Sequence, residues 1–142
     1  AVRISETPVI ASHSGVYNLK SIPRKLTDEE MIAIASRGGL IQVSIGRYFL
    51  STQPKSEVGL DHLIEHINYV VALVGIDHVG IGSDFDGGGG VNGCEDMGEM
   101  KAITRALLLE GYSRDEIRKL WGDNVLRVME EVGKYAESFQ QF

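Results

Sequence analysis

Two histidines and a glutamate in the segment HLIEH have the spacing of a zinc-binding helix. His62 and His66 are four residues apart, so both side chains lie on one helix face, with Glu65 just before the second. In one class of metalloprotease such a pair binds zinc while the glutamate activates water. That site also needs a third ligand, on a scaffold unlike the alternating strands and helices that this sequence predicts. We therefore expect the HLIEH helix to serve packing and not metal binding.

A stronger candidate site lies in the polar residues that follow three apolar segments. These segments are PVIASHS (residues 8–14), GLIQVSI (39–45) and HVGIGSDFDGGGG (78–90). The first brings His13, whose neutral imidazole is a good zinc ligand, and the third brings Asp84 and Asp86, whose carboxylates can accept protons. The glycine run at 87–90 lacks the Lys-Ser/Thr pair of a phosphate-binding loop. The residues alone leave open whether Asp84 or Asp86 is the functional carboxylate.

The elements that must position these residues alternate between strand and helix. Each apolar segment is short and rich in β-formers, which predicts a buried strand. Between the first two segments, Thr27 and Glu30 form a capping box for a helix that ends before Gly38. Between the last two, apolar residues recur with helical period from Val58 to Val74. The expected inward face of the first helix is Met31, Ile32, Ile34 and Ala35.

The order of these elements predicts a parallel α/β fold. Strands joined by helices form right-handed crossovers, and the functional residues of such folds gather at the carboxyl ends of the strands. The remainder is expected to be helical, at about 99–110, from Ser113 with its box partner Glu116, and from Asp123 to about Ser138. Three strands are too few to close a barrel and leave two unpaired edges, so either partners cover the edges or part of the fold is missing.

Composition bounds the class of protein. The chain has 142 residues, 43% of them hydrophobic and 24% charged, which suits a single domain over residues 1–142. With 14 basic and 20 acidic residues the net charge is −6, and no basic stripe indicates nucleic-acid binding. No apolar run reaches the roughly 20 residues of a membrane-spanning helix. The single Cys94 excludes an intrachain disulfide.

Four segments together resemble a known family. PVIASHS, PRKLTDEE, HINYVVALVGIDHVGIGSDFDG and LLLEGYSRDEIRKLWGDNVLRVMEEV are similar, in order and spacing, to the carboxyl-terminal part of the membrane (renal) dipeptidase family of zinc metallopeptidases. The resemblance covers Pro8 to Val132 and is most specific in SHS, with an arginine eleven residues after its histidine, and in GIGSDFDG. It implies the last three strands and terminal helices of an amidohydrolase-like (β/α)8 barrel, a partial domain whose N-terminal part lies upstream.

The resemblance also assigns roles to residues. His13 resembles a ligand of the family's binuclear zinc site, whose other ligands would lie upstream of Ala1. Arg24 resembles the arginine that binds the dipeptide carboxylate, and Asp84 the aspartate that takes a proton from zinc-bound water, with Asp86 left to order the loop through backbone hydrogen bonds. His66 matches a family histidine that is not a ligand. In the stretch SIGRYFLS, residues 49–51 keep the family pattern, whereas Ser44, Gly46 and Arg47 depart from it, which leaves the substrate preference open.

The sequence thus predicts a zinc-dependent dipeptidase in the intact parent, with the fragment alone inactive. Two alternatives remain: another amidohydrolase-like hydrolase, and a non-catalytic partial barrel that self-associates. The expected partners are a dipeptide, the N-terminal part of the barrel and a second copy in a homo-oligomer. The end of the chain, KYAESFQQF, lacks the hydrophobic tail of a GPI signal. A soluble protein of the bacterial cytoplasm is expected, although the sequence does not define the compartment.

Overall fold

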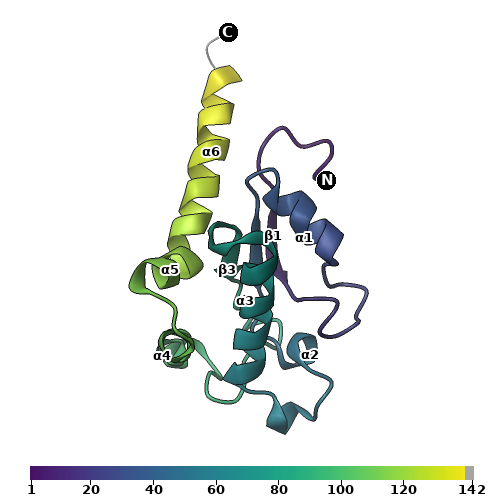
Figure 1. Cartoon of the computed structure of the whole chain (residues 1–142), viewed down its shortest axis with the longest axis vertical. Coiled ribbons are helices and arrows are strands. Elements are labelled where there is room, and N and C mark those ends of the chain that lie inside the picture. The colour runs from purple at the N-terminus through teal and green to yellow at the C-terminus, as the bar shows by residue number, and fades with distance from the viewer. Residues whose placement is uncertain (140–142) are drawn as a thin grey trace.

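Three parallel strands form the centre of the structure. The computed structural model describes residues 1–139 and contains one sheet in the order β1-β2-β3. The strands are β1 (Ile10–Ser14), β2 (Leu40–Val43) and β3 (Val79–Ile81), and helices connect them in sequence (Figure 1). The predicted parallel α/β fold is confirmed.

The backbone register aligns the carboxyl ends of the strands. Ala11 pairs with Ile41, which pairs in turn with Val79. Hydrogen bonding continues beyond the assigned strands, because the N–H of Ser44 donates to Ser14 O at 2.8 Å. The N–H of Ile45 likewise donates to Ser83 O at 3.0 Å. The three strand ends are therefore held side by side at one rim.

The prediction of a strand in PVIASHS is confirmed by β1, but its expected burial is wrong. Ile10 and Ala11 are only partly buried, and Ser12 and His13 are exposed. Within residues 1–139 no strand pairs with the second edge of β1, so that edge and the adjacent side chains remain open. By contrast, β2 lies between two strands and is almost fully buried. The expectation of two unpaired sheet edges is confirmed by β1 and β3.

Helix α1 (Asp28–Ala35) connects β1 to β2. Its predicted capping box is confirmed: Thr27 Oγ1 accepts from the N–H of Glu30, and the Glu30 carboxylate accepts from the N–H of Thr27 at 2.9 Å. Met31 and Ile34 are buried as expected, whereas Ile32 is exposed and its predicted inward position is wrong. Ile32 is adjacent in sequence to Met31, so it projects about 100° around the helix from that buried residue.

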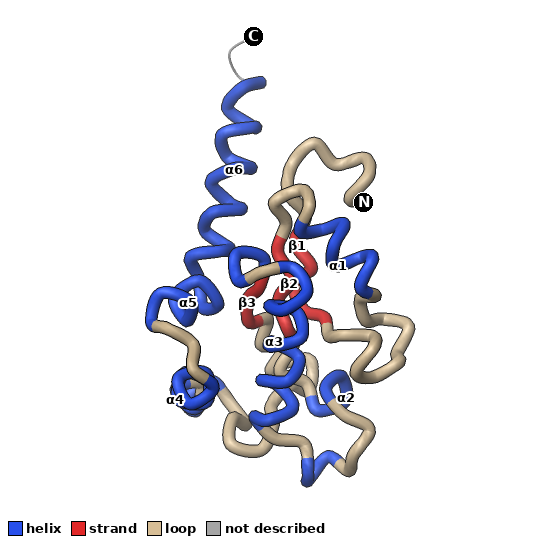
Figure 2. The backbone as a smooth tube through the Cα atoms, in the orientation of Figure 1, coloured by secondary structure: helices blue, strands red, loops and turns tan. Residues whose placement is uncertain are grey.

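The connection from β2 to β3 is longer and contains a helix that packs against the sheet. Helix α2 (Arg47–Leu50) is a single turn at the end of β2, and α3 (Leu60–Val74) then runs back along the sheet to Gly75, where it was predicted to end (Figure 2). Short 3₁₀ turns lie at Lys55–Glu57 and Ile76–His78. The buried side chains of α3 are Leu63, Ile64, His66, Ile67 and Val70.

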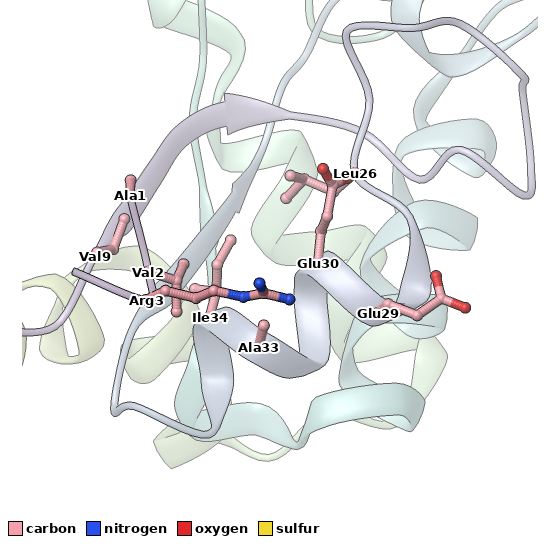
Figure 3. Close-up of a pocket in the computed structure, with 9 residues that line it drawn as sticks. All are labelled: Ala1, Val2, Arg3, Val9, Leu26, Glu29, Glu30, Ala33 and Ile34. Carbon is pink, nitrogen blue, oxygen red and sulfur yellow. The ribbon is translucent and has the colours of Figure 1, made fainter. Parts of the chain in front are cut away.

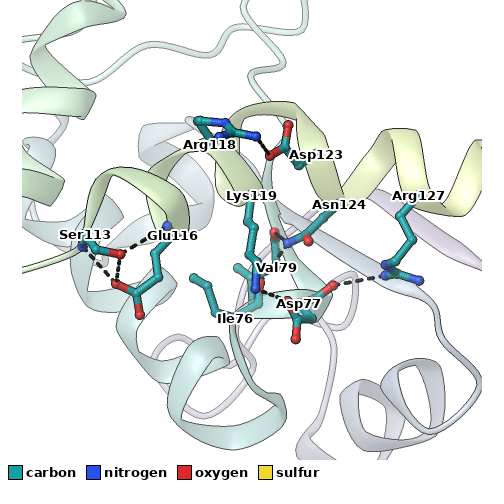
Figure 4. A network of polar contacts seen from close by, with 10 residues as sticks. All are labelled: Ile76, Asp77, Val79, Ser113, Glu116, Arg118, Lys119, Asp123, Asn124 and Arg127. Carbon is teal, nitrogen blue, oxygen red and sulfur yellow. Dashed lines mark hydrogen bonds and ion pairs between the residues drawn. The ribbon is translucent and has the colours of Figure 1, made fainter.

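The C-terminal region is helical and is fixed to the amino-terminal end of β3. After a 3₁₀ turn (Met97–Glu99) come α4 (Lys101–Glu110), α5 (Arg114–Arg118), a π-helical segment (Lys119–Asp123) and α6 (Asn124–Phe139), which extends away from the sheet (Figure 1). Figure 4 shows the polar anchors: Asn124 donates to Ile76 O and Val79 O, and Lys119 pairs with Asp77 at 2.6 Å. No helix among the described residues is both long and apolar enough to cross a bilayer.

His66 is a structural residue inside this core. Its side chain is fully buried; Nδ1 accepts from the N–H of Val16 at 3.1 Å and Nε2 donates to Leu50 O at 3.1 Å. The neutral imidazole thereby joins the loops that follow β1 and β2. Burial, followed by the positive charge of Lys25, lowers the pKa of His66 to about 4.

Acidification should therefore destabilise the fold through His66. An unfolded histidine binds a proton near pH 6.5 and the folded one only near pH 4, so stability is lost as the pH falls through that interval. The loss between pH 7 and pH 4 should be about 3 kcal/mol, measured by urea unfolding with Trp121 fluorescence. In His66→Gln, whose amide can both accept and donate, this pH-dependent loss of unfolding free energy should disappear. In His62→Gln it should remain. Equal pH dependence in the two variants would contradict the assignment.

Candidate active site at the carboxyl rim of the sheet

His13 lies at the end of β1 with both ring nitrogens in hydrogen bonds. Nε2 is 2.6 Å from Arg24 Nη2, and Nδ1 is 2.9 Å from Ser12 Oγ. Because a guanidinium only donates, Nε2 must be the acceptor and Nδ1 carries the proton that goes to Ser12. His13 is thus a neutral imidazole whose Nε2 lone pair faces the rim, which is the form that binds a metal ion.

Arg24 reaches the same place from the loop between β1 and α1. Its guanidinium carbon lies 5.0 Å from the centre of the Phe49 ring, a cation–π distance. Phe49 belongs to α2, and the Tyr48 ring packs edge-on against it with centres 5.6 Å apart. Lys20 stabilises helix α2 by donating hydrogen bonds to the carbonyl oxygens of Tyr48 and Ser51. Residues from two loops therefore fix the position of Arg24.

Asp84 follows β3 in an unusual backbone conformation. Its φ is +69°, and it is the only non-glycine residue with positive φ in the part of the chain that the structure describes. Such a conformation is unfavourable for a residue with a side chain, although aspartate tolerates it better than most. The carbonyl oxygen of Asp84 accepts from the N–H groups of Gly87 at 3.2 Å and Gly89 at 2.8 Å. These two bonds turn the chain tightly around Asp84.

Glycine at position 87 makes room for the Asp84 carboxylate. A Cβ atom added at Gly87 would collide with Asp84 Oδ1, and one added at Gly89 would meet the Asp84 carbonyl oxygen at 2.5 Å. The glycine run therefore packs directly against Asp84, at a distance that a side chain would not allow. Gly90 extends it by donating to Ile45 O at 2.6 Å, which ties the loop to the end of β2.

The three predicted site residues line two adjoining hollows. Arg24 and Asp84 line an outer hollow of about 710 Å³ together with Phe49 and the glycine run. His13 and Asp84 line an inner hollow of about 310 Å³. Gly82 allows this approach, since a side chain there would collide with the backbone of Ser12 at the end of β1. The rim thus brings together an imidazole, a guanidinium and a carboxylate.

The other candidate residues lie elsewhere or make different contacts. His62 pairs with Asp61 at 3.0 Å and His66 is buried, which agrees with a packing role for HLIEH. His78 bonds to Gly39 O at 2.9 Å at the opposite end of the sheet. The Asp86 side chain is exposed and makes no hydrogen bond within residues 1–139, so the expectation that Asp86 orders the loop is wrong. The backbone of Asp84 does so instead.

Sequence reasoning did not find the residues that support the site. In the sequence, Phe49 only matches the family pattern, and the glycine run only lacks the residues of a phosphate-binding loop. Close approaches such as that of Gly87 to Asp84 depend on backbone angles, which residue spacing does not reveal. Ser44 Oγ at the end of β2 is buried without a hydrogen-bond partner among the described residues, so the rim also holds a polar atom that the chain itself does not satisfy.

A separate hollow lies far from these groups. It measures about 550 Å³ and lies between the N-terminal residues and α1 (Figure 3). Its lining is largely aliphatic, with Val2, Val9, Leu26, Ala33 and Ile34 among the residues shown. It contains no histidine or cysteine, and of its two carboxylates, Glu29 and Glu30, the second is already used in the capping box of α1.

A parallel sheet with connecting helices that superimposes on part of a solved dipeptidase structure is part of a (β/α)8 barrel. Within that class, the chain belongs to the membrane dipeptidase family, peptidase family M19, whose profile matches residues 1–142. This confirms the family resemblance seen in the sequence. One solved structure of family M19, to which the chain is 30% identical, is described as dipeptidase AC, a metallopeptidase.

Individual relatives agree with this assignment. The chain is 38% identical to dipeptidase ataJ of Aspergillus terreus over 133 residues, which are 93% of this chain and 32% of that protein. It superimposes with a TM-score of 0.91 on the probable dipeptidase PvdM of Pseudomonas aeruginosa, at 33% identity, covering 94% of this chain and 47% of that one.

A Rhodobacter sphaeroides metallopeptidase, solved with a phosphinate mimic of L-Ala-D-Ala, gives a TM-score of 0.87 at 30% identity. The match covers 92% of this chain and 38% of that one. The chain therefore spans between about a third and a half of the length of these relatives.

The contact between Gly87 and Asp84 predicts an energetic coupling. Gly87→Ala should lower the free energy of unfolding by about 1 kcal/mol, because the new methyl group forces the Asp84 carboxylate to rotate out of its position. In an Asp84→Gly background, which keeps the positive φ and removes the carboxylate, the same change should cost much less. Gly122→Ala, where nothing lies within 4 Å and the backbone is helical, is the control and should not destabilise the protein, because alanine favours a helix more than glycine does. Equal costs in both backgrounds would refute the coupling.

Proposed function

We propose that this chain supplies three functional residues to the active site of a zinc-dependent dipeptidase. The observation that carries the proposal is the convergence of His13, Arg24 and Asp84 at one rim, from the ends of β1 and β3 and the loop after β1. Residues 1–142 are then one partial domain of the enzyme, and the remainder of the barrel is its principal partner. Membership of the dipeptidase family supports this choice of reaction.

His13 is the metal ligand of the proposal. Its Nε2 lone pair can either accept from Arg24 or bind a metal ion, but not both. No three histidine, cysteine or acidic side chains within residues 1–139 lie close enough to form a metal site. A catalytic zinc needs about three protein ligands, so the others must come from the rest of the barrel. Bound zinc would polarise the scissile carbonyl and lower the pKa of its water.

Arg24 and Asp84 then act on the substrate and on the proton. When the imidazole of His13 binds metal, the Arg24 donor that pointed at Nε2 becomes available, and a planar guanidinium can hold a carboxylate through two parallel hydrogen bonds. The Phe49 ring limits where that guanidinium can go. Asp84 faces both hollows, so it can take a proton from attacking water on the inner side and return it to the leaving amine.

Dipeptide hydrolysis by the complete gene product that contains this chain tests the proposal. With zinc added, Asp84→Asn should lower kcat by a factor of about 10²–10⁴, because the amide cannot accept the proton. Asp86→Asn is the matched control, since this neighbouring carboxylate is exposed and makes no contact at the site. Activity in the Asp84→Asn variant equal to that of the Asp86→Asn control would contradict the role of Asp84.

A further inference from the structure

The lining of the outer hollow contains two cationic side chains, Arg24 and Lys55, that pair with no carboxylate of the described residues. Four cationic side chains, Lys20, Arg24, Lys25 and Lys55, belong to the two loops that border it, whereas the chain as a whole carries a net charge of −6. None of the four forms an ion pair with a carboxylate of the described residues. Such a local excess of one charge attracts ligands of the opposite charge.

Two of these cations are held by neutral oxygen atoms. Lys20 donates to the carbonyl oxygens at the end of α2, and Lys25, which is only 3% exposed, donates to Val16 O at 3.3 Å. Burial and the nearby charge of Lys20 lower the pKa of Lys25 to about 8. Both ammonium groups therefore add positive charge to the loop that carries Arg24 and pair with no carboxylate of the described residues.

Lys55 is placed differently, because it lies on the wall of the hollow itself. It begins the 3₁₀ turn after α2 and shares the lining with Arg24 and Tyr48. Lys55 is exposed and makes no hydrogen bond or ion pair with any residue from 1 to 139. Asp84 is the only carboxylate among the described lining residues. Arg24 and Lys55 thus line a hollow whose one carboxylate, Asp84, already has the proposed role of proton acceptor.

We propose that the preferred substrates are dipeptides whose C-terminal residue carries a second carboxylate, with Lys55 as the residue that selects it. This inference rests on the proposed function, in which Arg24 holds the terminal carboxylate. Once Arg24 is so occupied, the ammonium of Lys55 is the remaining unpaired cation on the lining. An acidic side chain at the C-terminal residue would project from the same carbon atom as the terminal carboxylate and could pair with Lys55.

The test compares acidic dipeptides with amides of the same shape. Using the complete gene product with zinc at low ionic strength, kcat/KM is measured for Ala-Asp against Ala-Asn and for Ala-Glu against Ala-Gln. We expect an acid-to-amide ratio of about fivefold, the effect of one exposed ion pair, and a smaller ratio at 0.5 M NaCl. Lys55→Met should bring the ratio to about one, and Lys55→Glu should invert it. Lys101→Met, an exposed lysine at the start of α4, is the matched control.

The outcomes separate this inference from the proposed function. Equal cleavage of acids and amides by the unaltered protein would overturn the inference and leave dipeptidase activity standing. A preference for acids that survives in Lys55→Met would likewise remove Lys55 as the selecting residue. Cleavage of L-Ala-D-Ala but of none of the four dipeptides would overturn the inference alone, whereas failure to cleave all five, in a protein shown to be folded and loaded with zinc, would overturn both proposals. The assignment of substrate selection to Lys55 also requires that Lys101→Met keeps the acid-to-amide ratio of the unaltered protein.

Discussion

The alignment of three parallel strand ends is the constraint on which the rest of the structure depends. Backbone hydrogen bonds from Ser44 to Ser14 and from Ile45 to Ser83 continue the sheet beyond its assigned strands. Because parallel strands all run in the same direction, whatever follows each of them must emerge at the same rim. His13 and Asp84 are 71 positions apart in the chain (84 − 13) yet line one small hollow for this reason.

Local contacts then decide where each functional group points. Asp84 takes a positive φ that costs energy, and the turn formed by Gly87 and Gly89 offsets this cost with two backbone hydrogen bonds. Arg24 is restrained by an aromatic face and not by a carboxylate, so its charge stays available to a ligand. Buried His66 joins the segments that follow β1 and β2 through hydrogen bonds to Val16 and Leu50. Protonation of His66, which is not itself a site residue, would therefore disturb the position of the rim.

Much of this organisation could be predicted from the sequence. The capping box at Thr27, the end of α3 at Gly75 and the parallel alternation follow from local propensity and hydrophobic period. The exposure of β1 agrees with the predicted unpaired edge and not with the apolar composition of PVIASHS, because burial depends on elements outside the segment. The support of Asp84 by Gly87 was missed for a similar reason: composition shows that glycines are present but not which backbone angle they serve. The residue pattern left Asp84 and Asp86 equivalent, and only the family resemblance separated them.

A crystal structure of the complete gene product with zinc and a phosphinate dipeptide analogue would test the central claim most directly. Anomalous scattering at the zinc edge would locate the metal. The account predicts His13 Nε2 as a zinc ligand, the Arg24 guanidinium moved from His13 to the analogue's carboxylate, and the Asp84 carboxylate within hydrogen-bonding distance of a phosphinate oxygen. Zinc bound without His13, or an analogue carboxylate held away from Arg24, would contradict it.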